Sequence, residues 1–391
     1  MKKKILFVIP SFEIGGTVVS IRNLIYLLDK KKYDITVMPM QNKGTMMPLY
    51  EDVRQQQASL IIRAMASPSW KSANNSIYKF IYGAIRFISH IRFLRNILLK
   101  LSASRSLNKR QYDIVIASQE GFCTKYVSYF NIPHRISWVR CEYERYLREC
   151  RIDNEVAMYR KYKSIVCVSE LIAKSFKSIY PEFESKIYAI NNPQSIEYIY
   201  NQADIDDKDI RFKNDKFTIV SVGRFDRVKR FSYIPFIASF LKRHKVDFNW
   251  YIIGGGDAIE TAQIKQNIES EAVTEFVHCL GIKSNPHYYI KKSDLLVSLS
   301  RSEACPRVIN EAKILHTPVV CTDFPTAYEY IKNGYDGIIA PFELIHQDIL
   351  EIIQNREMYN TILDNISKFK FDNTEILNNI DQVFYKDTSD S

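Results

Sequence analysis

The sequence lacks the cysteine spacing that a metal site or a disulfide framework requires. The 391 residues include seven Cys, an odd number, scattered and never spaced as C-x-x-C. This pattern argues against both kinds of site and for a reducing compartment. No stretch reaches the roughly 18 uncharged apolar residues of a membrane span. The apolar run from Ile5 is also too short for a signal peptide and ends at Pro10, so we expect a cytoplasmic protein.

The composition is that of a folded protein, with 46% hydrophobic and 25% charged residues, which excludes disorder as the main state. Lys and Arg number 54 against 44 Asp and Glu, a net charge of +10. Such a surface favours anionic partners, among them phosphorylated metabolites, nucleic acid and acidic membranes. No nucleic-acid-binding module is recognisable, which disfavours the second class.

Short apolar runs alternate with helical periodicity along the whole chain, a pattern typical of α/β units around parallel sheets. The expected strands are 5–9, 33–38, 112–117, 135–139, 164–169 and 186–190 in the first half, and 216–222, 248–253, 276–280, 294–300, 318–322 and 337–340 in the second. A polar segment, 191–209, separates the two sets. We therefore predict two Rossmann-like, doubly wound domains facing a central cleft, where ligands of such folds bind.

The loop after the first expected strand contains Gly15 and Gly16 and leads into an amphipathic helix. Paired glycines let amides at a helix N-terminus approach a bound group closely. The dinucleotide pattern G-x-G-x-x-G is absent. A turn that only reverses the chain is the alternative interpretation.

The second domain opens with a basic loop. Gly223 is followed by four cations within residues 224–230, including Arg224 and Lys229, at a strand's carboxyl end. Arg offers a fork for phosphate oxygens and Lys a point charge, so a diphosphate suits this loop. A solvated charge run is the alternative. Gly254, in the triple glycine after the next strand, is weaker evidence for a tight turn beneath a ligand.

Two glutamates, Glu303 and Glu311, lie eight residues apart. We expect Glu303 to precede a helix and Glu311 to lie two turns inside it. If the loop folds back over the helix start, both carboxylates accept hydroxyl hydrogen bonds from one ligand. Two unrelated surface carboxylates are the alternative.

In combination these residues resemble the retaining glycosyltransferases of family 4, also called group 1, which have the two-domain GT-B fold. The resemblance runs from Ile5 to about Pro341 and is strongest from Ile219 onward. Besides the glycines, the cations and the glutamate pair, it rests on Val168-Ser169-Glu170, Asn192-Pro193, Gly281 with Asn285-Pro286, Pro318 to Asp323, and Asn333 to Gly337. The order and spacing of these motifs are specific, although each alone is common.

The resemblance implies a division into residues 1–192, an acceptor-side domain, and 193–372, a domain that binds the nucleotide sugar. Residues 373–391 would form a helix returning to the first domain and a tail. It also implies roles for individual residues. Arg224, Lys229 and Glu303 would be catalytic, the two cations on the diphosphate and Glu303 on the transferred sugar. Glu311 would bind the ribose. The remaining donor-binding residues would be Gly15, Gly16, Gly223, Gly254, Ile282, Lys283, Ala304, Cys305, Pro306 and Arg307.

The implied activity is transfer of a sugar from a UDP- or GDP-linked donor to an acceptor hydroxyl with retention, in bacterial surface polysaccharide synthesis. The partners would be the donor, a glycan or lipid-linked acceptor and an anionic membrane surface, with the enzyme peripheral on the inner face of the membrane. No cofactor or metal is expected, since the departing phosphate takes the acceptor's proton. A nucleotide-sugar epimerase on the same fold and a non-catalytic nucleotide-sugar-binding subunit stay open as alternatives.

Two departures from the family pattern concern the site. Arg140 stands where many members have a histidine that meets the sugar. Two roles stay open for it: it replaces the hydrogen bond of that histidine, or it binds an anionic group on the donor or acceptor. Ala304-Cys305 replaces the frequent Gly-Phe, which alters the pocket's shape. We expect Cys305 to line a pocket and not to act as a nucleophile, because no nearby histidine activates it.

Residues 77–110 contain eight Lys and Arg and no Asp or Glu, with apolar residues at helical spacing. A basic amphipathic helix of this kind lies on an anionic membrane in one interpretation. In the other, the same stripe packs on the first domain's sheet. Periodicity does not separate the two.

Overall fold

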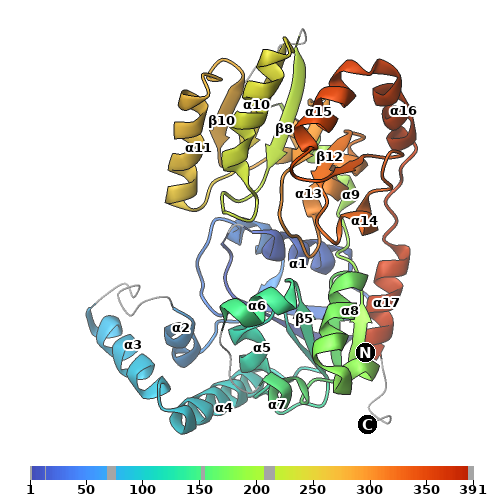
Figure 1. Cartoon of the computed structure of the whole chain (residues 1–391). Helices are drawn as coiled ribbons and strands as arrows, with labels where there is room; N and C mark the ends of the chain where they lie inside the picture. The colour runs from blue at the N-terminus through green and yellow to red at the C-terminus, as the bar shows by residue number, and fades with distance from the viewer. Residues whose placement is uncertain (1, 14, 68–75, 151–154, 207–215, 386–391) are drawn as a thin grey trace. The chain divides into compact units, whose positions relative to one another are not determined.

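A computed structural model describes residues 2–13, 15–67, 76–150, 155–206 and 216–385. The chain divides into two compact units, unit 1 with Met1–Pro193 and Asn373–Ser391, and unit 2 with Gln194–Asp372. Each unit contains one parallel sheet with helices packed around it (Figure 1). The α/β fold class with two doubly wound units is confirmed.

Unit 1 contains a seven-stranded parallel sheet in the order β3-β2-β1-β4-β5-β6-β7. Its strands are β1 (Lys3–Ile9), β2 (Tyr33–Pro39), β3 (Arg54–Gln55), β4 (Ile114–Ala117), β5 (Arg135–Val139), β6 (Ser164–Cys167) and β7 (Ile187–Ala189). Its helices are α1 (Gly16–Leu27), α2 (Leu60–Ala66), α3 (Ser76–Ser89), α4 (Arg92–Lys109), α5 (Phe122–Val127), α6 (Tyr143–Glu149), α7 (Glu155–Tyr159), α8 (Glu170–Ile179) and α17 (Thr374–Tyr385), with 3₁₀ turns η1 (Met47–Tyr50) and η3 (Pro181–Lys186).

Unit 2 contains a six-stranded parallel sheet in the order β10-β9-β8-β11-β12-β13. Its strands are β8 (Phe217–Val222), β9 (Phe248–Ile253), β10 (Val277–Gly281), β11 (Leu295–Ser298), β12 (Val319–Thr322) and β13 (Ile338–Ala340). Its helices are α9 (Ile196–Ala203), α10 (Ile234–Arg243), α11 (Ala258–Ser270), α12 (Pro286–Lys291), α13 (Arg307–Ile314), α14 (Ala327–Tyr330), α15 (Ile345–Gln354) and α16 (Arg356–Ser367), with the 3₁₀ turn η4 (Phe231–Tyr233).

The strands of unit 2 are apolar on both faces because helices cover both sides of the sheet. On β8, Ile219 belongs to one buried cluster and Val220 to the cluster on the other face. On β9, Trp250 and Tyr251 divide in the same way. Side chains alternate across a strand, so a sheet covered on both sides requires a mostly apolar run.

The last helix, α17, packs on unit 1 beside the chain's beginning (Figure 1). Lys3 Nζ donates to the Phe384 carbonyl at 2.9 Å, and Tyr33 donates to Asp381 at 2.7 Å. The Phe384 side chain is fully buried and meets the Tyr33 ring edge to face. Unit 1 is therefore built from two segments far apart in sequence. In the part of the chain that the structure describes, no helix has the length and apolarity to cross a membrane.

Candidate active site

The site of interest in unit 2 lies at the carboxyl ends of β8 and β11, which are neighbours in the sheet. The strand order reverses between them, because β8 continues to β9 on one side while β11 continues to β12 on the other. The loops that leave two such strands diverge and open a crevice, the usual ligand position in doubly wound sheets. The basic loop follows β8, and the loop of Glu303 follows β11.

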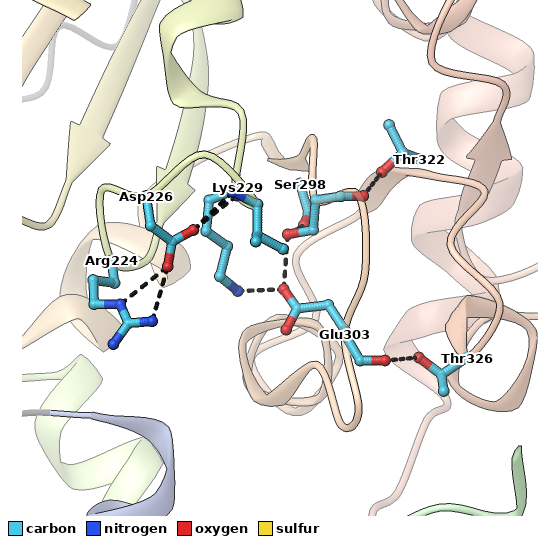
Figure 2. Close-up of polar contacts among 9 residues, drawn as sticks. Arg224, Asp226, Lys229, Ser298, Glu303, Thr322 and Thr326 are labelled. Atoms are coloured by element: carbon cyan, nitrogen blue, oxygen red, sulfur yellow. Dashed lines mark hydrogen bonds and ion pairs between the residues drawn. The ribbon is translucent and has the colours of Figure 1, made fainter. Parts of the chain in front are cut away.

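Asp226 organises the basic loop after β8. Its Oδ1 accepts the main-chain N–H groups of Val228 and Lys229 at 3.0 and 3.1 Å, which closes a tight turn. Its Oδ2 accepts Nε of Arg224 at 3.0 Å, and the guanidinium turns toward this carboxylate in Figure 2. The Arg224 side chain is still 75% exposed. One acidic residue thus holds the turn and orients an exposed cation.

Lys229 reaches across to the loop after β11 and forms an ion pair with Glu303 (Figure 2). The two side chains are only 22% and 13% exposed. Ser300 donates to the same Glu303 oxygen at 2.7 Å, and Thr326 donates to the Glu303 carbonyl at 2.7 Å. The catalytic cation and carboxylate expected from the sequence are therefore in direct contact.

Glu311 lies on α13, buried between two basic groups. Arg307, one turn earlier, donates to Oε1 at 2.5 Å, and Nε2 of His287 on α12 lies 3.8 Å from Oε2. Burial by itself raises the pKa of Glu311, but the Arg307 guanidinium and His287 outweigh it and lower the pKa to about 2. The side chain is therefore a carboxylate at neutral pH, able only to accept hydrogen bonds.

The position of Glu311 in its helix differs from the prediction. Pro306 is the N-cap residue and α13 begins at Arg307, so Glu311 lies just over one turn inside the helix and not two. The structure gives no direct contact between Glu311 and the Lys229–Glu303 pair among its described residues; Glu311 is instead paired with Arg307 and His287.

Gly254 is a glycine for a steric reason. Its φ is +152°, and a Cβ there would lie 1.8 Å from the Gly223 carbonyl oxygen. The loops after β8 and β9 are thus packed backbone to backbone. The loop after β10 adds Ile282, 62% exposed, whose Cγ1 would lie 2.7 Å from a Cβ on Gly255. The ammonium of Lys283 lies 5.8 Å from the Tyr289 ring centre.

The residues between the two glutamates connect the loop to the core. Cys305 is partly buried and packs against the cluster that contains Ile309 and Tyr330. Ala304 is also partly buried, whereas Pro306 is buried at the start of α13. The segment from Ala304 to Pro306 therefore forms one side of the loop and is held in place by α13 and the core.

Three further predicted residues, Gly15, Gly16 and Arg140, lie in unit 1. A Cβ on either glycine would meet no described atom within 4 Å, and Gly15 has an extended φ of 171°. The fold of the described chain therefore does not require glycine at these two positions, in contrast to Gly254.

Arg140, at the end of β5, is held in place by a local network. Its Nε donates to the Ser118 carbonyl at 2.7 Å and Nη1 to Asn192 at 2.5 Å. Its main-chain N–H donates to Glu120 at 2.9 Å. These contacts fix the guanidinium at the carboxyl edge of the unit 1 sheet.

Sequence reasoning missed two residues that shape the site. Asp226 had a signal, since an Asp followed by a turn often accepts the N–H groups two and three residues on. His287 had none, because its proximity to Glu311 arises only when α12 packs against α13. Within the described ranges, no group of three or more His, Cys, Asp or Glu is placed to hold a metal ion.

Comparison with known proteins identifies the part of the chain around this site. Residues 202–369 match the family Glycosyl transferases group 1. This segment of the chain is therefore similar to the group 1 glycosyltransferases. The matched segment includes β8 to β13 and contains the basic loop, the Lys229–Glu303 pair and Glu311.

The similarity to known proteins extends beyond the matched segment to the whole fold. An uncharacterized 41.2 kDa protein in the cps region of Klebsiella pneumoniae is 23% identical over 75% of this chain and 77% of its own. The Vi polysaccharide biosynthesis protein VipC/TviE of Salmonella typhi is 28% identical over 31% of this chain and 21% of its own. The crystal structure of Anabaena HepE in complex with UDP superposes with a TM-score of 0.72, at 15% identity, over 99% of this chain and 100% of that one. The chain therefore has the GT-B fold and relatives in polysaccharide biosynthesis.

Proposed function

We propose that this chain transfers a sugar from a UDP- or GDP-linked donor to an acceptor hydroxyl with retention at the anomeric carbon. The observation that carries the proposal is the Lys229–Glu303 pair at the strand-order reversal, with Arg224 on the same loop as Lys229. A cation for the leaving diphosphate and a carboxylate for the sugar are thereby held against each other.

Lys229 has the capacity for both contacts. An ammonium group has three N–H donors, and the pair with Glu303 uses one of them. The others suit the oxygens of a diphosphate, with Arg224 approaching from the exposed side of the loop. Because both cations are positioned beforehand by Asp226 and Glu303, they stabilise the charge that grows on the leaving group without reorganising.

Glu311 suits the ribose of the donor nucleotide. A carboxylate accepts several hydrogen bonds, so contacts with Arg307 and His287 leave acceptor capacity for sugar hydroxyls. Its low pKa keeps it ionised throughout the neutral range. Ile282 and Lys283, on the loop after β10, would then lie near the base.

In the proposed reaction, the bond between the anomeric carbon and the donor phosphate oxygen breaks, and a bond to the acceptor oxygen forms on the same face. The acceptor's proton passes to the departing phosphate oxygen, so no separate protein base is needed. The UDP bound to HepE, a protein of the same fold, supports a nucleotide diphosphate as the leaving group.

The pathway is proposed from the relatives. The Vi polysaccharide protein and the Klebsiella protein of the cps region support a role in bacterial surface polysaccharide synthesis. The acceptor would then be a glycan or a lipid-linked sugar, and the enzyme would work peripherally at the inner face of the membrane.

The test begins with thermal unfolding of the purified chain against a panel of UDP- and GDP-sugars, because a ligand of the folded state raises its stability by mass action. The stabilising donor is then incubated with candidate acceptors, and the anomeric configuration of the product is read by NMR. We expect a product with retained anomeric configuration. Glu303→Gln should abolish transfer, whereas Glu357→Gln, which changes an exposed carboxylate on α16, should leave it unaffected. Epimerised donor formed without acceptor, or binding without any transfer, would overturn the proposal.

A further inference from the structure

Helices α3 and α4 of unit 1 present a row of large apolar side chains to solvent. Four of them are more than two-thirds exposed: Ile77, Phe80, Phe87 and Phe93, at 72%, 79%, 76% and 71%. We call the exposed set the α3–α4 apolar face; it comprises Ile77, Phe80, Phe87, Ile88, Ile91, Phe93, Ile97 and Leu101. Exposed apolar side chains are ordinary one at a time, but a continuous group of this size marks an interaction surface.

On α3, the exposed stripe is the one that a core-facing helix would bury. Ile77, Phe80 and Phe87 follow the spacing of a helix's apolar face. The structure turns other residues of α3 toward α2, where Arg86 donates to the Ser67 carbonyl. No described residue of α3 is buried. Of the two interpretations of this segment, packing on the unit's sheet does not describe the α3 stripe.

On α4, the same apolar face continues opposite the buried side. Leu99, Ser102, Ala103 and Ser106 are buried, and Ser102 and Ser106 lie 3.2 Å from the Tyr126 hydroxyl. At about 100° per residue, Phe93, Ile97 and Leu101 fall on the opposite side of the helix. Lys100 and Arg105 fall on either side of this row and are exposed. Helix α4 is thus anchored by one face and presents an apolar row bordered by cations on the other.

The single basic helix expected over 77–110 is in fact two helices, broken at His90 and Ile91. Phe87, Ile88, Ile91 and Phe93, which flank or lie in this break, are all exposed. Figure 1 shows α3 and α4 meeting at this junction, with α3 away from the strands of unit 1.

We propose that α3 and α4 bind the surface of an anionic membrane through this face. Phe80, Phe87 and Phe93 would enter the boundary between headgroups and acyl chains, and Lys100 and Arg105 would contact lipid phosphates. The charge pattern selects this partner, because residues 76–110 carry eight cations and no carboxylate. A uniformly anionic surface over an apolar layer complements that pattern.

The surface is separate from the transfer site, which lies in unit 2, so binding to membranes is testable without turnover. The experiment is flotation of the whole chain with vesicles of phosphatidylcholine alone or mixed with phosphatidylglycerol. We expect binding to the mixed vesicles only, weakening as salt rises and screens the charges. Phe87→Ser with Phe93→Ser should reduce binding about tenfold or more, and Lys100→Glu with Arg105→Glu should do the same.

Matched controls change the same residue types elsewhere. Ile259→Ser with Leu344→Ser, and Arg243→Glu with Lys265→Glu, alter exposed residues of unit 2 and should bind like the parent. Circular dichroism and the thermal unfolding midpoint of each variant check that it is folded. Neither measurement needs a nucleotide, so failure of this inference stays distinguishable from failure of the proposed function. Equal binding by the α3–α4 variants and the parent would overturn the inference. A second result would also overturn it: the parent does not bind vesicles but forms a dimer, and Phe87→Ser with Phe93→Ser makes it monomeric. That result would assign the face to a second copy of the chain.

Discussion

At the residue scale, the two cations of the basic loop differ in how the fold uses them. Lys229 is mostly buried and paired with Glu303, whereas Arg224 is mostly exposed and paired with Asp226. A partly buried charge left without its partner costs more than an exposed one. The same two residues are proposed to bind one diphosphate, so their substitutions separate stability from binding.

We predict that Lys229→Ala lowers the free energy of unfolding by about 1–3 kcal/mol, because among the described residues it leaves Ser300 as the side-chain donor to the Glu303 carboxylate. Arg224→Ala should change it by less than about 0.5 kcal/mol. Both should weaken UDP binding by about tenfold or more, as each removes a charge-assisted contact. Urea titrations and calorimetry measure the two effects. Wild-type UDP affinity in both variants would mean that the basic loop is a solvated surface.

Glu311 gives a prediction for acid stability. Its pKa is lowered from 4.5 to about 2 in the folded chain, so its contribution is present above pH 4.5 and is lost as the pH falls toward 2. Between these pH values the unfolded chain binds a proton at Glu311 that the folded chain does not, so acid favours unfolding. We expect Glu311→Gln to lower stability at pH 7 and to flatten the loss of stability between pH 4.5 and 2.

Urea unfolding at stepped pH values measures this slope. Glu357→Gln, which alters an exposed carboxylate of the same unit, serves as the control and should keep the wild-type slope. An unchanged slope in Glu311→Gln would show that Arg307 and His287 do not hold the carboxylate in its ionised form.

At the scale of elements, hydrophobic patterning predicted most of both sheets. The apolar runs at 5–9, 135–139 and 248–253 correspond to β1, β5 and β9. Strands buried on both faces leave a mostly apolar run, which is the strongest signal that a sequence offers for a parallel sheet. β3 was missed because Arg54–Gln55 is a pair of exposed polar residues at the sheet's edge.

The sequence predicted the site residues that belong to local motifs, but not the contacts that arise only when distant elements pack together. The positions of Lys229 and Glu303 at strand ends followed from the strand pattern, but their ion pair spans 74 residues. The neighbourhood of Glu311 and His287 likewise depends on how α12 packs against α13. For α3, the apolar spacing indicated a helix correctly but not the surface that its stripe faces, because periodicity is the same for a core and a membrane.

Helix α17 carries a prediction about unit 1. Phe384 is fully buried, and its removal leaves a cavity beside Tyr33. We expect Phe384→Ala to destabilise unit 1 by about 3–5 kcal/mol. Gln382→Ala, an exposed change on the same helix, should cost less than about 0.5 kcal/mol. Hydrogen exchange in the strands of unit 1 measures the effect by region. Equal protection in both variants would mean that α17 does not contribute to the core.

At the scale of the whole molecule, the excess of cations bears on how the donor's charge is met. The chain carries ten more Lys and Arg than Asp and Glu, from 54 − 44, and the loop after β8 places four of its cations in residues 224–230. Enzymes that handle diphosphates stabilise the leaving charge either with a divalent metal or with fixed cationic side chains and amides. The two strategies require different side chains, namely clustered carboxylates and histidines for the metal, and Lys and Arg for the alternative.

The basic loop favours the second strategy, so we predict that transfer by the whole chain survives EDTA. We expect the same transfer rate with and without chelator. Lys229→Ala and Arg224→Ala should lower kcat, because the charge that these two side chains stabilise grows as the glycosidic bond breaks. The measurement is initial transfer rate in EDTA, and again after adding excess Mg²⁺ or Mn²⁺. Parallel assays at two salt concentrations check that any change comes from the metal and not from ionic strength, which screens the same cations. Loss of activity in EDTA that Mg²⁺ or Mn²⁺ restores would show that a metal, and not the loop after β8 alone, neutralises the diphosphate.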